Sequence, residues 1–458
     1  MKDFDPVRAN AITALDQIIN QDKFSNDVLN ELFSKGDFTD LDKRFMTALV
    51  YGTLERLPFL DYWIQAFSDL DFKKIDPYIL LILRIGVWQL KFGDKIPAFA
   101  AIDESVKLAK FFQKKHFSGF VNGVLRKINS ESLDLPKKRK HLEFGFSAEI
   151  FGLYKQWFGE EKTIKFLKNS MASPRDLTIL FIGNVAEKEK WLSQCSQHKI
   201  EVEPGYLLEN TYILKNFSGN ISELPGFKAG KIYIQNESAV LPSKTIHLLE
   251  SDTEKAINFL DACAGLGGKT IAFKNCCPKL NILALEPNEK RFASLLENIK
   301  RLNLKNIDAL KIELQELKLH EVNKEQFDFI VLDVPCSGLG VVHHKPEIKL
   351  KLTYEKMQNF PKLQLELLNN AAGLLKENGI ICYCTCTINP DENQNLISRF
   401  LESKTGKSFN KVDLNKLIPF FMEQAKPIIN KLTIDNDIQI LPGNYNLDGF
   451  YISCLQKK

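Results

Sequence analysis

Apolar side chains recur at helical spacing through residues 1–130. Asp5-Pro6 combines the residue types typical of an N-cap and of the first helical position, and a second Asp-Pro pair follows at 76–77. The stripe after the first pair consists of Val7, Ala11, Ile12, Leu15, Ile18 and Ile19. We therefore predict an all-α domain over residues 1–130, with such stripes in its core.

The pattern changes twice after this domain. Residues 131–143 are polar and charged and are predicted to form a linker, and residues 144–235 mix helical stretches with short strand-like runs, which predicts a small α+β (RRM-like) connector subdomain. Within residues 236–458, apolar runs are separated by helical lengths, and they lie at 257–260, 282–285, 329–332 and 380–383. Such alternation predicts an α/β domain built on a doubly wound parallel sheet, of the Rossmann-like kind.

Composition narrows the class of protein. The hydrophobic share of 44% and the aromatic share of 10% exclude a largely disordered chain. Nine cysteines in 458 residues suit a reduced cytoplasmic protein better than a disulfide scaffold. The most apolar helical stretch, 78–88, is too short to span a bilayer. We expect a soluble, monomeric, cytoplasmic protein with no membrane partner.

Positive charge is concentrated in one part of the chain. Residues 101–140 hold ten Lys or Arg against four Asp or Glu, a net of +6 beside +4 for the whole chain. This stretch ends in Pro136-Lys137-Lys138-Arg139-Lys140. The run could neutralise phosphates of a nucleic acid or could be a solvated linker, and charge alone does not decide.

A glycine-rich loop follows the first strand of the predicted sheet. The segment reads Asp261-Ala262-Cys263-Ala264-Gly265-Leu266-Gly267-Gly268-Lys269-Thr270. Its Gly-x-Gly-Gly spacing matches neither the dinucleotide fingerprint nor the phosphate loop. Glu286 ends the next strand 21 residues after Gly265, where an acidic side chain suits a ribose diol. A plain tight turn is the alternative, but together these features favour a nucleoside-type cofactor. A side chain at Gly267 should block it with little effect on the fold.

Two cysteines follow neighbouring apolar runs. Asp333-Val334-Pro335-Cys336 comes directly after one strand, and Cys386 follows another. Because the carboxyl ends of such strands line the ligand crevice, both thiols should face the reactive end of the cofactor. A thiolate that adds to C6 of a pyrimidine makes C5 nucleophilic, and a second group must then remove the C5 proton.

The cysteines and histidines allow other interpretations. Cys382 and Cys384 are expected to be inert core residues. A metal held by them together with Cys386 is disfavoured, because alternate side chains on a strand lie about 6.6 Å apart. Cys336 could also be structural. His343-His344 should point apart and meet solvent or RNA rather than a metal.

The motifs resemble one family. Asp-x-Pro-Cys together with Thr-Cys-Thr-x-x-Pro-x-Glu-Asn is similar to the RNA cytosine-C5 methyltransferases of the Sun type, most closely to their bacterial RsmB branch. The helical N-terminus resembles the NusB-type RNA-binding domain of that branch on Asp42-Lys43-Arg44, Leu49-Val50-Tyr51-Gly52, Ile96-Pro97 and the segment Gly119-Phe120-Val121-Asn122-Gly123-Val124-Leu125-Arg126.

The resemblance implies an activity and roles for residues. It implies transfer of a methyl group from S-adenosyl-L-methionine to C5 of a cytosine in 16S ribosomal RNA, free or in a pre-30S particle. Cys386 would be the nucleophile, Cys336 would assist product release, and Asp333 would contact the base edge and the methionine end of the cofactor. Glu286 would hold the ribose, and the residues that wrap the cofactor would be Cys263, Ala264, Gly265, Leu266, Gly267, Gly268 and Lys269. Methylation of tRNA or another RNA, or a non-catalytic role as an RNA-binding ribosome assembly factor, are the alternatives.

The chain departs from the family pattern at four places. Ala264-Gly265-Leu266 stands where the family usually has Ala-Ala-Pro, which should loosen the loop. Glu286 replaces an aspartate, and the usual aspartate near the third strand is missing from 312–316. The connector reads Leu180-Phe181-Ile182-Gly183-Asn184, without the usual arginine.

Overall fold

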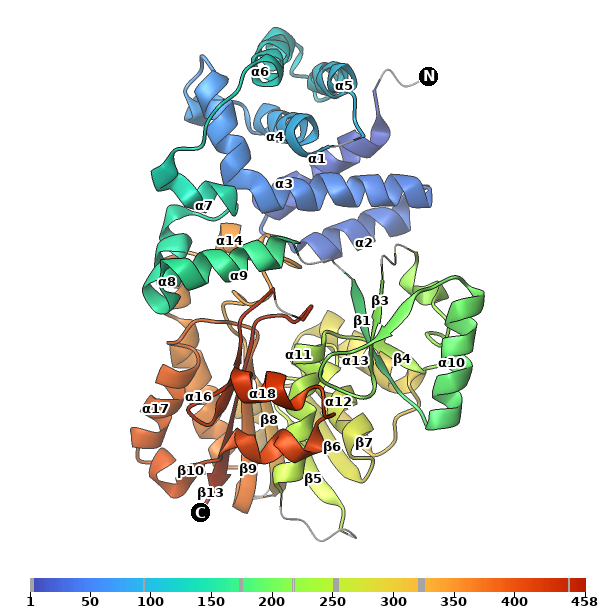
Figure 1. The fold of residues 1–458 in the computed structure, drawn as a ribbon, viewed down its shortest axis with the longest axis vertical. Helices are drawn as coiled ribbons and strands as arrows, with labels where there is room; N and C mark the ends of the chain where they lie inside the picture. The colour runs from blue at the N-terminus through green and yellow to red at the C-terminus, as the bar shows by residue number, and fades with distance from the viewer. Residues whose placement is uncertain are drawn as a thin grey trace. The chain divides into compact units, whose positions relative to one another are not determined.

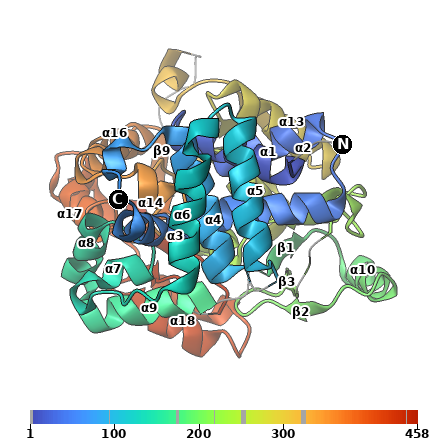
Figure 2. The ribbon, with the colours of Figure 1, turned by 90° about the horizontal axis from the view of Figure 1, so that it is seen from above.

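The computed structural model describes residues 4–93, 95–172, 176–215, 217, 219–249, 255–319, 326–443 and 445–458. The chain forms two compact units. The first contains residues 1–163 and 342–354, and the second contains residues 164–341 and 355–458. Figures 1 and 2 show the ribbon from two sides.

The first unit is helical, as predicted. Its elements are α1 (Pro6–Ile19), α2 (Ser25–Lys35), α3 (Asp40–Phe67), η1 (Phe72–Lys74), α4 (Pro77–Phe92), α5 (Ala98–Phe111), η2 (Lys115–Phe117), α6 (Ser118–Ser130), η3 (Lys137–Arg139), α7 (Lys140–Glu143), α8 (Ala148–Phe158), the start of α9 (Glu160–Ala172), and α14 (Ile348–Lys351). Asp5 and Asp76 cap α1 and α4 by accepting from backbone N–H groups two and three residues ahead. The apolar stripe of α1 is buried apart from Ile19, which is partly buried, as expected from its spacing.

The segment 131–143, predicted to be a linker, contains short helices at its end. Residues 131–136 lack regular structure, but η3 and α7 occupy residues 137–143. The side chains of Lys138, Arg139 and Lys140 are exposed, while that of Lys137 lies outside the described residues. Lys140 Nζ lies 2.9 Å from a carboxylate oxygen of Glu160. The boundaries at residues 130, 143 and 235 stay predictions.

Residues 342–354 belong to the helical unit although they follow the Cys336 loop in the chain. The buried carboxylate of Glu347 accepts hydrogen bonds from the backbone N–H and the hydroxyl of Ser25, at 3.1 and 2.9 Å. Lys349 Nζ donates to the backbone oxygens of Glu55 and Phe144, at 2.8 and 3.2 Å. This packing explains why the segment clusters with helices that lie more than 180 residues earlier in the sequence.

The second unit begins with a four-stranded antiparallel sheet of order β2-β3-β1-β4. Its elements are β1 (Leu177–Phe181), α10 (Val185–Gln197), β2 (Val202–Pro204), β3 (Thr211–Leu214), η4 (Ile221–Glu223) and β4 (Ile232–Ile234). One face packs against Trp191 of α10. Leu180, from the other face, joins the core of the larger sheet, so this small sheet is sandwiched rather than open on one side.

The larger sheet has nine strands in the order β11-β12-β13-β9-β8-β5-β6-β7, with β10 paired to β13. The strands are β5 (Ile257–Asp261), β6 (Leu280–Leu285), β7 (Ile307–Leu310), β8 (Phe327–Asp333), β9 (Leu375–Thr385), β10 (Phe409–Lys411), β11 (Thr433–Ile434), β12 (Asp437–Ile440) and β13 (Phe450–Lys457). Strands β7, β6, β5, β8 and β9 are mutually parallel. The parallel part of the sheet agrees with the prediction from the apolar runs, and β10 to β13, for which no direction was predicted, pair antiparallel.

Helices cover both faces of this sheet. Phe259 and Phe329 point to a core formed with α12 and α13, whereas their neighbours Leu260 and Ile330 point to a second core formed with α16 and α17. The remaining elements of the unit are α11 (Glu237–Val240), η5 (Leu241–Leu248), α12 (Gly268–Cys276), α13 (Glu289–Arg301), η6 (Leu314–Leu319), α15 (Tyr354–Met357), α16 (Phe360–Ala372), α17 (Gln394–Glu402), η7 (Gly406–Ser408), η8 (Leu414–Phe420) and α18 (Lys426–Leu432). The predicted Rossmann-like core is therefore confirmed.

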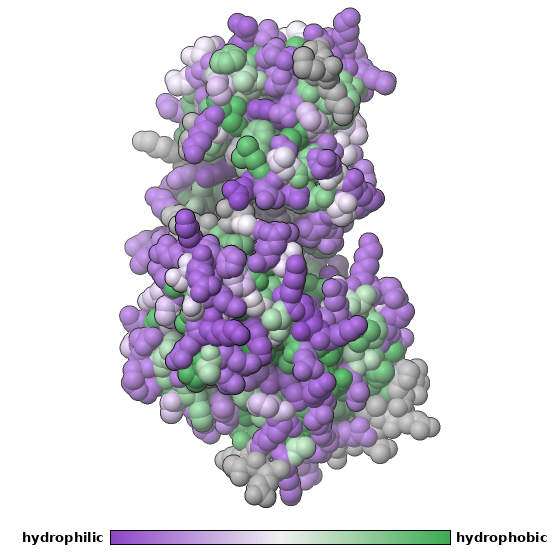
Figure 3. All heavy atoms as spheres, turned by 90° about the vertical axis from the view of Figure 1, so that its right-hand side faces the viewer, coloured by the Kyte–Doolittle hydropathy of each residue, from purple (hydrophilic) through white to green (hydrophobic). Residues whose placement is uncertain are grey.

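Hydrophilic side chains predominate on the face drawn in Figure 3, with small hydrophobic areas between them. Within the described residues, no helix combines the length and the apolar character needed to cross a membrane.

Candidate active site

The two predicted cysteines meet at the carboxyl ends of β8 and β9. Cys336 Sγ lies 3.4 Å from Cys386 Sγ, and both residues are partly buried. The backbone N–H of Val334 donates to the oxygen of Cys384 at 3.2 Å, and that of Gly340 donates to the oxygen of Cys386 at 3.0 Å. The parallel pairing of β8 with β9 thus continues into the two loops that carry the thiols.

The contact between the sulfurs has an electrostatic consequence. The pKa of Cys336 is raised well above the usual thiol value, first by its hydrogen bond with Cys386 and then by burial. Two thiolates in contact would repel each other, so at most one of the pair is ionised near neutral pH.

A buried carboxylate ties the two loops together. Glu392 is completely buried and accepts from the backbone N–H of Ser337 at 2.8 Å and from the side-chain amides of Gln364 and Asn389 at 3.0 and 2.8 Å. Ser337 directly follows Cys336, and Asn389 lies three residues after Cys386. Burial raises the pKa of Glu392, and these donors counter that rise.

Hydroxyl groups add a second tie between the loops. Ser337 Oγ lies 2.6 Å from the hydroxyl of Thr387, the residue after Cys386. Asn393 donates to the backbone oxygen of Thr387 at 3.0 Å and accepts from the hydroxyl of Thr385 at 2.7 Å. Glu392 and Asn393 stood in the motif that carried the family resemblance, but sequence reasoning gave them no role. The sequence feature that could have identified them is a pair of adjacent polar residues just before a helix, in a loop that carries a candidate nucleophile.

The glycine loop lies between β5 and α12, as predicted. Gly265 and Gly267 have φ values of +58° and +93°, in the left-handed region that favours glycine. A Cβ on Gly265 would meet nothing within 4 Å, whereas one on Gly267 would lie 2.8 Å from Leu295 Cδ1. A side chain at Gly267 would therefore have to displace the end of the Leu295 side chain, whereas Gly265 opens onto free space.

Lys269 brings a buried positive charge to this edge of the sheet. Its Nζ lies 3.0 Å from Asp333 Oδ2 and 4.9 Å from the ring centroid of Phe450. Burial opposes the charged form of Lys269, but Asp333, Cys384 and Cys386 raise its pKa overall. The lysine therefore stays protonated. Asp333 also accepts from the thiol of Cys384, with 3.7 Å between sulfur and oxygen.

Two buried oxygens beside the loop have no hydrogen-bond partner among the described residues, namely Asp261 Oδ1 and Gln235 Oε1. Asp261 is fully buried, and this burial raises its pKa to about 6, although the hydroxyl of Thr270 donates to its other oxygen at 2.6 Å. Sequence reasoning did not single out Asp261 as a ligand-binding residue. Unsatisfied buried acceptors such as these indicate a place for a donor group that the protein itself does not supply.

The remaining residues predicted to bind the cofactor lie in the same loop or at the end of β6. Cys263 and Ala264 lie between β5 and the glycines, and the N–H of Ala264 donates to the oxygen of Leu285 at 2.8 Å. Leu266 has a side chain that is 51% exposed, so it covers the loop from outside. Glu286 is buried directly after β6 and accepts from the N–H of Asn288 at 2.8 Å. Glu313, in the region where the usual aspartate is missing, is exposed.

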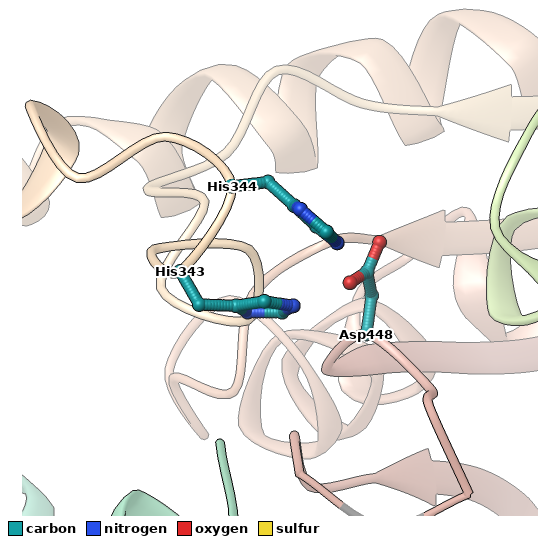
Figure 4. Close-up of side chains that lie close together, drawn as sticks. All are labelled: His343, His344 and Asp448. Atoms are coloured by element: carbon teal, nitrogen blue, oxygen red, sulfur yellow. The ribbon is translucent and has the colours of Figure 1, made fainter. Parts of the chain in front are cut away.

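The histidine pair differs from the expectation. His343 and His344 lie in a turn rather than on a regular element. Their ring centroids are 4.0 Å apart with the planes inclined by 42° (Figure 4), so the two side chains do not point apart.

Comparisons with known proteins agree with this geometry. Residues 246–456 match the family described as 16S rRNA methyltransferase RsmB/F, and residues 5–130 match the NusB family. The probable ribosomal RNA small subunit methyltransferase B of Bacillus subtilis is 30% identical over 99% of both chains. This chain belongs to the RsmB/F methyltransferase family. The ribosomal RNA small subunit methyltransferase B of Proteus mirabilis is 29% identical, also over 99% of both chains.

Solved structures share the fold of this RsmB/F-family chain. The crystal structure of PH0851 aligns over 100% of both chains with a TM-score of 0.80 at 21% identity. A methyltransferase homolog protein from Pyrococcus horikoshii aligns over 71% of this chain and 100% of its own, with a TM-score of 0.56 at 22% identity.

Glu392→Gln should lower the rate of methyl transfer by this RsmB/F-family protein and leave cofactor affinity unchanged. The amide replaces one acceptor oxygen with a donor, so one tie to the loops is lost, and a displacement of about 1 Å at reacting groups can cost about 100-fold in rate. Single-turnover kinetics with titration calorimetry measures both quantities. Glu402→Gln, an exposed change at the end of α17, is the matched control. Equal rates for Glu392→Gln and the wild type would show that this carboxylate does not position the cysteines.

Proposed function

We propose that the chain transfers a methyl group from S-adenosyl-L-methionine to C5 of a cytosine in 16S ribosomal RNA. The observation that carries this proposal is the pair of thiols 3.4 Å apart at the ends of adjacent strands. The relatives named ribosomal RNA small subunit methyltransferase B support the choice of RNA. We further propose that the protein acts as a cytoplasmic monomer.

Cytosine C5 needs covalent help before it can accept a methyl group. In the proposed reaction the thiolate of Cys386 adds to C6, and the electron pair displaced from the C5–C6 bond makes C5 nucleophilic. S-adenosylmethionine supplies an electrophilic methyl group on a positively charged sulfur. After transfer, C5 carries both a proton and the methyl group, and removal of that proton expels the Cys386 thiolate and restores the ring.

Lys269 supports the first of these steps. A buried ammonium group near Cys386 favours a negative charge on that sulfur. Because its pKa is raised rather than lowered, Lys269 keeps this charge at neutral pH. The charge of Asp333 balances it at 3.0 Å, so the ion pair is satisfied before any substrate arrives.

The contact between the sulfurs gives Cys336 a role that changes during the reaction. Before Cys386 adds to the base, its hydrogen bond to Cys336 is the largest factor that raises the pKa of Cys336. Once Cys386 is bonded to C6, its sulfur is neutral and no longer competes for negative charge. Cys336 can then lose its own proton to water and, as a thiolate, accept the C5 proton, which is the help with product release that we assign to it.

The described residues around the glycine loop fit the proposed cofactor. Asp261 Oδ1 and Gln235 Oε1 are buried acceptors that a bound amino group would satisfy, Gly265 leaves free space, and Glu286 lies where a ribose diol would need an acidic partner. We propose that Cys263, Ala264, Leu266, Gly267, Gly268 and Lys269 complete the cradle. Asp333 would face the methionine end and the base edge.

Gly265→Ala should weaken S-adenosylmethionine binding about tenfold or more. Its Cβ enters the space that the ligand would occupy, while the left-handed backbone costs an L-residue only about 1–2 kcal/mol of stability. Titration calorimetry measures the affinity and chemical denaturation checks the fold. Gly373→Ala is the control, because Gly373 has a helical backbone and only an ordinary contact at 3.6 Å. Unchanged affinity in folded Gly265→Ala would place the cofactor elsewhere and favour the non-catalytic RNA-binding alternative.

Replacing each cysteine should stop the reaction at a different stage. Cys386→Ala should bind RNA reversibly and methylate nothing, because it has no thiolate to add to C6. Cys336→Ala should add, methylate and then stall, so that a denaturant-resistant protein–RNA complex accumulates when S-adenosylmethionine is present. A denaturing gel of each variant with 16S ribosomal RNA detects the complex, and transfer RNA serves as the competing substrate. A covalent band from Cys386→Ala alone would mean that the roles are reversed.

A further inference from the structure

Helices α5 and α6 border a groove of about 1030 Å³ on the helical unit. Figure 2 shows the two helices side by side, and they form a helical hairpin joined by residues 112–117. From Ala98 to Lys110 the groove runs along α5 for about 18 Å, at 1.5 Å per residue. None of its lining residues belongs to the thiol, carboxylate and glycine cluster described above.

A glycine of α6 exposes backbone in the lining of the groove. Gly119 lines the groove and is exposed, and a Cβ on it would meet nothing within 4 Å. Glycine in a helix costs about 0.5–1 kcal/mol of stability relative to alanine. A glycine that faces open space therefore leaves room for something to approach the α6 backbone closely.

The aromatic ring of Phe99 lies at one end of the groove. Phe99, in the first turn of α5, is 77% exposed although its ring is apolar. Asn122 and Asn129 supply amide groups along the same groove. An exposed ring beside polar amides suits a flat, polar-edged ligand such as a nucleic-acid base, which stacks on aromatic faces.

The charge of the groove is positive. Lys110, Arg126 and Lys127 line it, with Asp103 as the opposing carboxylate. Asp103 already pairs with Lys107 at 2.8 Å, and Lys127 Nζ lies 3.4 Å from the exposed Asp69. The lining therefore carries a net charge of +2, from three cations and one carboxylate, which is complementary to phosphates.

We propose that the α5–α6 groove binds a single-stranded segment of the RNA substrate, with one base stacked on Phe99 and phosphates near Lys110 and Arg126. This inference rests on the proposed RNA methyltransferase function. An apolar helix of a partner protein could also approach the exposed backbone at Gly119, but three lining cations against one carboxylate favour a polyanion. None of the lining residues takes part in the proposed thiol chemistry, so the groove should affect affinity and not chemistry.

The test measures RNA affinity for two variants and the wild type. One variant carries both Lys110→Glu and Arg126→Glu, and the other carries Phe99→Ala alone. For the charge variant we expect RNA affinity to fall at least tenfold and the slope of log affinity against log salt to flatten by about 1.4, since each single-strand phosphate contact contributes about 0.7. For Phe99→Ala we expect a loss of about fivefold or more from lost base stacking, with an unchanged salt slope. In methylation assays both variants should raise KM and leave kcat unchanged.

Lys73→Glu/Lys74→Glu is the matched control. It makes the same change in net charge on exposed side chains of η1, outside the groove. Equal losses of affinity in the control and the Lys110→Glu/Arg126→Glu variant would overturn the proposal, because only overall charge would matter. Unchanged RNA affinity in both groove variants, with wild-type methylation intact, would also overturn it and favour a protein partner for the groove. Absence of methylation by the wild type would instead count against the proposed function. The RNA-binding measurements would still test whether the groove binds RNA.

Discussion

The carboxylate of Glu392 accepts hydrogen bonds from both cysteine loops and from α16 although it is completely removed from water. A buried carboxylate is stable only when donors surround it, so moving any of these segments would leave charge or hydrogen-bonding groups unsatisfied. This constraint holds Cys336 and Cys386 within 3.4 Å of each other before substrate binds. The proposed chemistry depends on that proximity, because each thiol is useful only while the other acts on the same base.

The Lys269–Asp333 pair supplies the electrostatic side of the same arrangement. Both residues lie where β5, β8 and β9 end, so the parallel part of the sheet brings the ion pair, the glycine loop and the cysteines to one edge. The pKa of Asp261 is raised by burial and by the negative charge of Asp333, and the pKa of Cys336 is raised first by its hydrogen bond with Cys386 and then by burial. Lys269 is the buried cation that offsets this charge, which explains why so many acidic groups can gather around it.

Much of this arrangement could be predicted from the sequence, because it depends on local patterns. The caps at Asp5 and Asp76, the apolar strands and the motif cysteines are all short-range signals, and the structure confirms the elements they predicted. The antiparallel strands β10 to β13 were not predicted, since strand direction depends on pairing between distant segments. The packing of Gly267 against Leu295 and the convergence of donors on Glu392 are also tertiary contacts, which no spacing along the chain reveals. The His343–His344 pair was misjudged because it lies in a turn, where the geometry of regular elements does not apply.

The central claim of the proposed mechanism is that C5 of a cytosine receives the methyl group. Methylation at cytosine C5 must release the hydrogen attached to that carbon, whereas methylation of an exocyclic nitrogen or of a ribose hydroxyl leaves it in place. The direct measurement uses 16S ribosomal RNA labelled with tritium at cytosine C5, and it counts tritium released to water against methyl groups incorporated. The account predicts one tritium released for each methyl group transferred. Methyl incorporation without tritium release would contradict it.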